Sequence, residues 1–363
     1  MVQCRAHFDA PQVALSSDCR VFRPRKVFMS HPPFIAAQIQ SLIEDIRLLE
    51  AFVTAPLGLY SDVKMLREAL PFPEASELER SQQQERRLAY RNMTEDPPAT
   101  ALAAVAHARA SVHAAGAVVS NKGPVLNPEW TAQAETVLAR VERQVAGTVR
   151  SKLAARLTGV YVIVDPEATN GRPVAEVTKA ALRGGVRVIQ LRDKHGDKAQ
   201  MLDAAREIKS LCDEHEALFI TNDHADLALA SEAHGLHVGQ TDLPVQDARS
   251  VLEQTQIIGK SNNGVEEAVS SEAEGADYVA VGAVFATSTM DKSNRTPVGP
   301  ETIERVKSMV EVPVVAIGGI NASNIEAVVK AGADSVCVVS AVTLAADPAA
   351  AARELSTLAE EAK

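Results

Sequence analysis

The chain has 363 residues, a formal net charge of −10 at pH 7 and only 4% aromatic residues. Its length exceeds that of a typical single domain, so two domains are expected. The negative charge argues against non-specific binding to nucleic acid or to an anionic membrane surface. No apolar run approaches the ~20 residues that span a bilayer. The four cysteines have neither CxxC nor zinc spacing, which favours the cytoplasm.

The N-terminal part of the chain is predicted to be helical. Residues 1–33 look irregular, either disordered or a transit peptide, and residues 34–156 form the first expected domain. Apolar residues recur at helical spacing between Ile39 and Phe52. Further helices are expected over 100–118 and 129–157, with Trp130 as a packing anchor. No catalytic constellation stands out here, so a structural or partner-binding role is expected, and a homo-oligomer stays open.

From Gly159 onwards, short β-branched runs alternate with helical segments. Eight such units within residues 157–363 predict a (β/α)8 TIM barrel, an α/β fold. A doubly wound open sheet is the alternative, weakened because no GxGxxG follows the first strand. The expected strands are 160–164, 186–191, 217–221, 235–238, 256–260, 277–281, 312–317 and 334–339.

The segment VRVIQLRDK, residues 186–194, suggests an anion site. It begins as a buried strand and ends with Gln190, Arg192 and Lys194, spaced two apart. Side chains two apart on a strand share a face, so a strand that continued through them would point all three the same way. The alternative is a strand that frays into a solvated turn.

Polar residues gather after most of the other predicted strands. Asp223 and Asp242 follow neighbouring strands, and such a carboxylate pair suits Mg²⁺, which takes one or two protein carboxylates and keeps water and phosphate oxygens. Helix capping is the alternative for each aspartate. The nearby histidines His224, His234 and His237 lack metal-ligand spacing and are expected to be core or surface residues.

A phosphate site is expected near the last strands. Gly318 and Gly319 expose backbone N–H groups before a helix expected to begin at Asn321, and Ser340 ends the eighth strand. The long loop 282–299 carries Thr287, Ser288, Thr289 and Lys292, and suits a lid over a second phosphate. An ordinary tight turn and a surface excursion are the alternatives.

These motifs closely resemble the thiamine-phosphate synthase family over residues 157–360, in order and in spacing. The N-terminal phrase SLIEDIRLLEAF faintly resembles the helical extension of some bacterial synthases and assigns no chemistry. The motifs are QLRDK (190–194), TND (221–223), GLHVGQTDLP (235–244), GKS (259–261), ATST (286–289), AIGGI (316–320) and VVSA (338–341).

The resemblance implies a (β/α)8 barrel that joins hydroxymethylpyrimidine diphosphate to hydroxyethylthiazole phosphate, using Mg²⁺ and no protein nucleophile. It implies that Asp223 and Asp242 bind Mg²⁺. The pyrimidine diphosphate would contact Gln190, Arg192, Lys194, Asn222 and Ser261, and the thiazole phosphate Thr287, Ser288, Thr289, Gly319, Val339 and Ser340. One departure is Met290, where the family usually has lysine; we expect Lys292 to replace that charge.

Two alternatives compete with the synthase. A thiazole tautomerase shares the barrel but needs a positioned general base, which the sequence does not identify. A barrel that keeps phosphate binding without catalysis, as a sensor or scaffold, is favoured only by Met290.

Overall fold

The computed structural model describes residues 33–52, 60–69, 97–117, 119–120, 123–124, 126–287 and 296–363. The chain divides into two compact units, residues 1–139 and 140–363, so the division falls within helix α5 (Pro128–Ala154). The C-terminal half of α5 belongs to the second unit, where Arg150 pairs with Asp277 at 2.9 Å and donates to the carbonyl of Gln254.

The first unit is helical in its described part, as the sequence predicts. Buried apolar residues at three- and four-residue spacing, Leu42, Ile46 and Leu49, lie on one face of α1, which packs against α4. Trp130 is buried, as expected of a packing anchor. The elements are α1 (Pro33–Phe52), α2 (Tyr60–Ala69), α4 (Pro97–Gly116), the two-residue strands β1 (Val119–Ser120) and β2 (Gly123–Pro124), and the start of α5.

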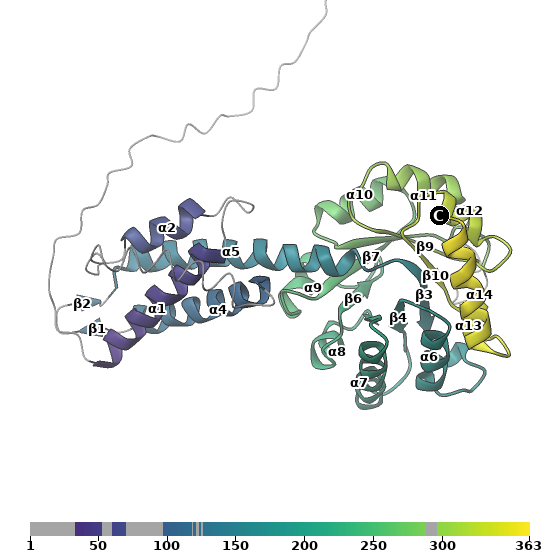
Figure 1. The fold of residues 1–363 in the computed structure, drawn as a ribbon, viewed down its shortest axis with the longest axis horizontal. Coiled ribbons are helices and arrows are strands. Elements are labelled where there is room, and N and C mark those ends of the chain that lie inside the picture. Colours follow the sequence, from purple (N-terminus) through teal and green to yellow (C-terminus); the bar gives the residue numbers. More distant parts are fainter. Residues whose placement is uncertain are drawn as a thin grey trace, which may run out of the picture. The chain divides into compact units, whose positions relative to one another are not determined.

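The second unit alternates strands with helices, and the strands form the centre (Figure 1). The strands are β3 (Gly159–Val164), β4 (Val188–Leu191), β5 (Leu218–Asn222), β6 (Gly235–Val238), β7 (Ile257–Asn262), β8 (Tyr278–Val281), β9 (Val314–Ile317) and β10 (Ser335–Val338). The helices are η2 (Pro166–Ala168), α6 (Val174–Arg183), α7 (Lys198–Glu214), α8 (Ala225–Ala230), α9 (Val245–Val251), α10 (Val265–Ala273), α11 (Pro300–Lys307), α12 (Ile325–Lys330), α13 (Ser340–Thr343) and α14 (Pro348–Glu361).

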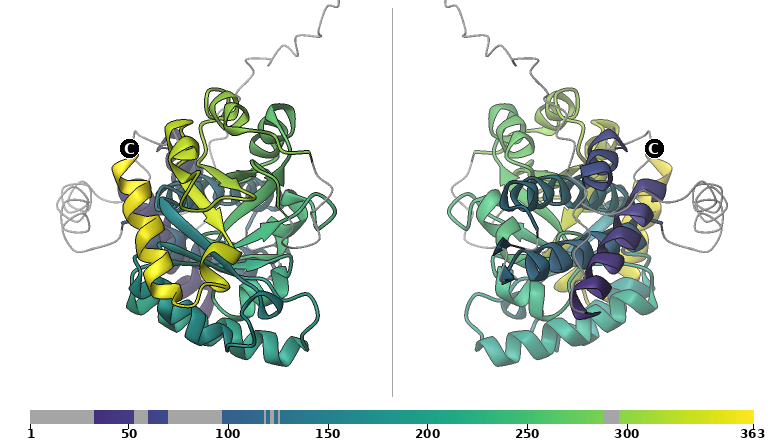
Figure 2. Two further views of the ribbon diagram at one scale, coloured as in Figure 1. Left: turned by 90° about the vertical axis from the view of Figure 1, so that its right-hand side faces the viewer. Right: turned by 90° about the vertical axis from the view of Figure 1, so that its left-hand side faces the viewer.

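All eight strands are parallel and form a closed barrel, because β10 pairs with β3 as well as with β9. This closure confirms the predicted TIM barrel and excludes the open sheet. The helices surround the strands (Figure 2). Successive side chains point to opposite faces of each strand, which gives two cores. Val160 and Val162 pack beneath the helices, whereas Tyr161 and Ile163 fill the barrel interior.

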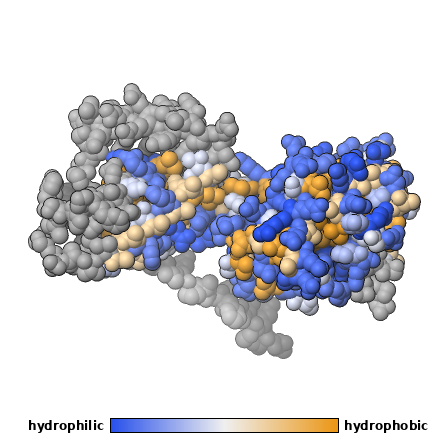
Figure 3. Space-filling model, turned by 90° about the horizontal axis from the view of Figure 1, so that it is seen from below, coloured by the Kyte–Doolittle hydropathy of each residue, from blue (hydrophilic) through white to orange (hydrophobic). Residues whose placement is uncertain are grey.

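The face of the barrel unit in Figure 3 mixes hydrophilic and hydrophobic side chains, as on most soluble proteins. Within the described residues, no helix is both long and apolar enough to cross a membrane.

Candidate active site

Three of the predicted site residues lie on the inner face at the C-terminal ends of neighbouring strands. Gln190 on β4 is two residues from the interior residue Val188, and Asn222 on β5 is two from Ile220. Ser261 on β7 follows the same alternation from Ile257. Parallel strands place all their C-terminal ends at one mouth of the barrel. These side chains therefore face the same opening.

Arg192 and Lys194 lie in the segment after β4, and not on the strand as predicted. Strand β4 ends at Leu191, so the argument from a shared strand face holds for Gln190 and fails for the two cations. The Arg192 guanidinium instead pairs with Asp165, a buried residue directly after β3. Lys194, half-exposed, places its Nζ 3.9 Å from Oδ2 of Asp223. Both cations therefore neighbour carboxylates at the barrel mouth.

Asp223 and Asp242 lie close together, as the sequence predicts. Burial, a hydrogen bond that protonated Asp223 donates to Asp242, and the negative charge of Asp242 raise the pKa of Asp223 to about 6, against the opposing effects of Lys194 and Arg192. Asp242 also accepts the backbone N–H of Gly239 at 2.7 Å. Asp223 has a φ of 59°, a conformation that aspartate tolerates better than most residues. The described residues contain no cluster of three or more potential metal ligands.

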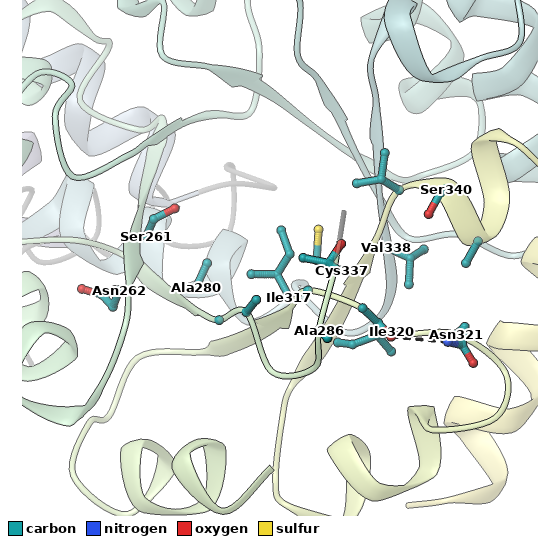
Figure 4. Close-up of a pocket in the computed structure, with 17 residues that line it drawn as sticks. Ser261, Asn262, Ala280, Ala286, Ile317, Ile320, Asn321, Cys337, Val338 and Ser340 are labelled. Carbon is teal, nitrogen blue, oxygen red and sulfur yellow. Dashed lines mark hydrogen bonds between the residues drawn. The ribbon is translucent and has the colours of Figure 1, made fainter. Parts of the chain in front are cut away.

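A second group of predicted residues lines one cavity of about 340 Å³ (Figure 4). Ser261 lies on one wall and Ser340 on the other, with Cys337 between them. The end of β9 and the turn that follows it also line the cavity, through Ile317 and Gly319. The predicted residues that line the cavity are Ser261, Thr287, Gly319, Val339 and Ser340.

The turn after β9 requires glycine at Gly319. Its φ is +66°, and an added Cβ would lie 2.5 Å from the carbonyl oxygen of Ala286. Only glycine therefore lets this turn pack against the segment at Ala286, which lines the same cavity. The predicted helix start at Asn321 is wrong, because α12 begins at Ile325 and Asn321 lies in the preceding turn. This six-residue helix thus gives no support to the expected anion site at a helix N-terminus.

Two polar residues of this region were missed by the sequence reasoning. His237 on β6 is buried, and its Nε2 lies 2.9 Å from Oγ of Ser261. The sequence predicts only a core or surface histidine here, whereas strand alternation from Gly235 places His237 inside the barrel. Asp165 is buried directly after β3, and its role depends on the contact with Arg192, which no pattern in the sequence indicates. Ser288, Thr289, Met290 and Lys292 lie outside the described residues.

Comparisons with known proteins identify the family of the chain. The family model for thiamine monophosphate synthase matches residues 160–342, half of the chain. The chain belongs to the thiamine monophosphate synthase family. The matched range runs from β3 into α13 and contains both aspartates and the whole cavity lining.

Similar members of this family cover different shares of the chain. A thiamine-phosphate synthase of Methanospirillum hungatei is 45% identical over 55% of this chain and 97% of its own. One from Thermosynechococcus vestitus is 34% identical over 88% of this chain and 92% of its own, so that likeness extends into the helical unit. The structure of thiamine phosphate pyrophosphorylase from Pyrococcus furiosus matches 58% of this chain and 98% of that one, with 37% identity and a TM-score of 0.53.

Proposed function

We propose that this chain is a transferase of thiamine biosynthesis, which joins 4-amino-2-methyl-5-(diphosphooxymethyl)pyrimidine to 4-methyl-5-(2-phosphooxyethyl)thiazole and releases diphosphate. The observation that carries the proposal is that a candidate metal–diphosphate site and a candidate phosphate pocket lie at the same barrel mouth. One is the carboxylate pair with its two neighbouring cations, and the other is the glycine- and hydroxyl-lined cavity.

The residues at the mouth fit a bound Mg²⁺. Asp223 and Asp242 offer the hard oxygen ligands that this ion prefers. The pKa of Asp223 is raised by burial first and by Asp242 second, and a bound cation would offset both effects. Bound Mg²⁺ supplies positive charge that stabilises the departing diphosphate. Two carboxylates suffice, because Mg²⁺ keeps several water and phosphate oxygens.

The cations Arg192 and Lys194 bind and orient the diphosphate from the side of β4, with Asn222 and Ser261 beside them. Asp165 holds the Arg192 guanidinium in place, so this cation is positioned before substrate arrives. Arginine suits this role because its fixed fork of donors matches phosphate oxygens. Lys292 is proposed as a further cation in place of the usual lysine at Met290.

The cavity is proposed to hold the thiazole phosphate, through Thr287, Ser288, Thr289, Gly319, Val339 and Ser340. Four of these residues, Thr287, Gly319, Val339 and Ser340, line the cavity, and its volume of about 340 Å³ falls in the range of small-molecule sites. The thiazole nitrogen then lies beside the pyrimidine methylene carbon, which ionises as the diphosphate leaves. The chain contributes orientation and charge, and no covalent protein intermediate is needed.

The two alternative functions gain no support from the site. A tautomerase needs a free general base, whereas both ring nitrogens of His237 are hydrogen-bonded within the barrel. The alternative of a non-catalytic sensor or scaffold depends on Met290 alone, and Met290 lies outside the described residues. The cytoplasm is the proposed compartment, because Cys212 and Cys337 are buried free thiols.

The test is to incubate the full chain with both substrates and Mg²⁺, and to measure thiamine phosphate and diphosphate together. The proposal requires equal amounts of both products and no diphosphate when the thiazole phosphate is omitted. Proton exchange on the thiazole alone would instead indicate a tautomerase, and substrate binding without turnover would indicate a sensor.

A further inference from the structure

Five side chains form a continuous hydrogen-bonded row inside the barrel, from β4 through β3 and β8 to β6 and β7. Nε2 of Gln190 donates to the hydroxyl of Tyr161 at 3.1 Å, and this hydroxyl lies 3.3 Å from that of Tyr278. The Tyr278 hydroxyl lies 3.1 Å from Nδ1 of His237. Nε2 of His237 lies 2.9 Å from Oγ of Ser261. The row thus ends at a residue of the cavity wall.

The protons of this row can be placed one after another, because each phenol carries a single proton. The Tyr161 hydroxyl accepts from Gln190, so its own proton points to Tyr278. The Tyr278 hydroxyl accepts that bond and therefore donates its proton to Nδ1 of His237. A neutral imidazole that accepts at Nδ1 carries its proton at Nε2. His237 consequently donates to Ser261.

The surroundings keep both phenols protonated. Tyr161 and Tyr278 are fully buried, and burial raises the pKa of each above its ordinary value of 10. His237 also stacks on the Tyr278 ring, with ring centroids 5.7 Å apart. The imidazole is therefore held by a hydrogen bond at each nitrogen and by a ring face, which leaves it little freedom to rotate.

We propose that this row fixes His237 as the Nε2-protonated tautomer, and that Ser261, accepting from His237, turns its own hydroxyl proton into the cavity as a donor to the substrate. His237 is then a positioning residue and Ser261 the residue in contact with substrate. The acceptor is an oxygen or ring nitrogen of the pyrimidine diphosphate, which would bind at the Ser261 side of the cavity while the thiazole phosphate binds at the side of Ser340. This part of the inference rests on the proposed function.

The tautomer can be measured in the ligand-free protein, without any assumption about the reaction. Long-range ¹⁵N–¹H spectra of the imidazoles at pH 8 distinguish protonation at Nε2 from protonation at Nδ1. The His237 signals are assigned by their loss in His237→Gln. His234 is an internal reference, because its Nδ1 accepts the backbone N–H of Phe219 at 2.9 Å and must also be Nε2-protonated.

We expect His237 to show the Nε2-protonated pattern of His234 in the wild-type chain. Tyr278→Phe removes the donor to Nδ1, so the His237 pattern should become a mixture while that of His234 stays unchanged. A wild-type His237 protonated at Nδ1 would overturn the proposal. A pure Nε2-protonated pattern that survives Tyr278→Phe would show that the row does not set the tautomer.

Kinetics test the role of the Ser261 proton. His237→Leu should lower kcat/KM at least tenfold, whereas His237→Gln, whose amide can donate from the Nε2 position, should recover most of it. Ser261→Ala combined with His237→Leu should be no slower than Ser261→Ala alone, because His237 acts through that hydroxyl. Equal loss in the Leu and Gln variants, or additive losses in the double variant, would contradict this role. Failure of all variants and wild type to turn over would refute the proposed function while leaving the tautomer result intact.

Discussion

Replacing Asp223 with asparagine should stabilise the metal-free protein while removing its activity. The pKa of Asp223 is raised from 3.8 to about 6, first by burial and then by Asp242. One pKa unit corresponds to about 1.4 kcal/mol, so keeping this carboxylate ionised costs the folded state about 3 kcal/mol. The Asp223 side chain keeps 18% of its exposure, so solvent screens part of that cost. We therefore expect a gain of about 1–3 kcal/mol at pH 8.

The sign of the pH dependence follows from the raised pKa. The folded state binds the Asp223 proton more tightly than the unfolded state, so wild-type stability falls as pH rises from about 4 to about 6. Above that range the folded state bears the full free-energy cost of an ionised Asp223. The advantage of Asp223→Asn should consequently be largest at pH 8 and shrink by about half at pH 5. Asparagine tolerates the φ of 59° as well as aspartate does, so no backbone strain is added.

Calorimetry of the full chain with a chelator present measures this effect. For a unit of this size, 1–3 kcal/mol corresponds to a rise in the barrel's Tm of roughly 2–12 °C. Asp226→Asn is the matched control, since Asp226 lies three residues after Asp223, at the start of α8, and forms an exposed surface pair with Lys198. The control should change Tm little at either pH. A Tm gain of equal size at pH 5 and pH 8, or none at pH 8, would refute the electrostatic reasoning.

Four further predictions address the other parts of the site. Mg²⁺ affinity should fall about tenfold per pH unit below pH 6, where Asp223 takes up a proton; calorimetric titration showing a constant Kd would contradict this. Asp165→Asn should raise KM for the pyrimidine diphosphate roughly tenfold by releasing Arg192, with KM for the thiazole phosphate unchanged in steady-state assays. Gly319→Ala should weaken thiazole phosphate binding and lower stability by about 1–3 kcal/mol, through its positive φ and the contact with Ala286. Normal binding and Tm would contradict the proposed role of the turn at Gly319 in phosphate binding. Lys292→Ala should lower turnover severely, and near-normal turnover would remove Lys292 from the site.

Much of the barrel was predictable because short β-branched runs alternate regularly with helical segments along the sequence. Each predicted strand overlaps an observed one, and strand alternation alone places Gln190, Asn222 and Ser261 inside. The position of Arg192 was not predictable in this way, since it depends on where β4 ends and on Asp165, which is distant in sequence. The row through Tyr161, Tyr278 and His237 could not be predicted either, because these residues lie on strands that are not neighbours and their side chains meet only inside the closed barrel.

The sequence pattern gave a wrong helix start where a turn precedes the helix. The predicted helix start at Asn321 ignored the turn in which Asn321 itself accepts from Ser323. Asparagine favours such turns through its side-chain acceptor, as well as helix caps. The predicted domain boundary at 156/157 stays a prediction, and the compact units divide within α5, where Arg150 ties the helix to Asp277.

Anomalous diffraction from crystals soaked with Mn²⁺, the pyrimidine diphosphate and a non-reactive thiazole phosphate analogue would test the assembled site directly. We predict a manganese peak bound by Asp223 and Asp242, the diphosphate beside Arg192 and Lys194, and the second phosphate over Gly319 near Ser340. A manganese peak away from the two aspartates, or a phosphate bound outside the cavity, would contradict the account.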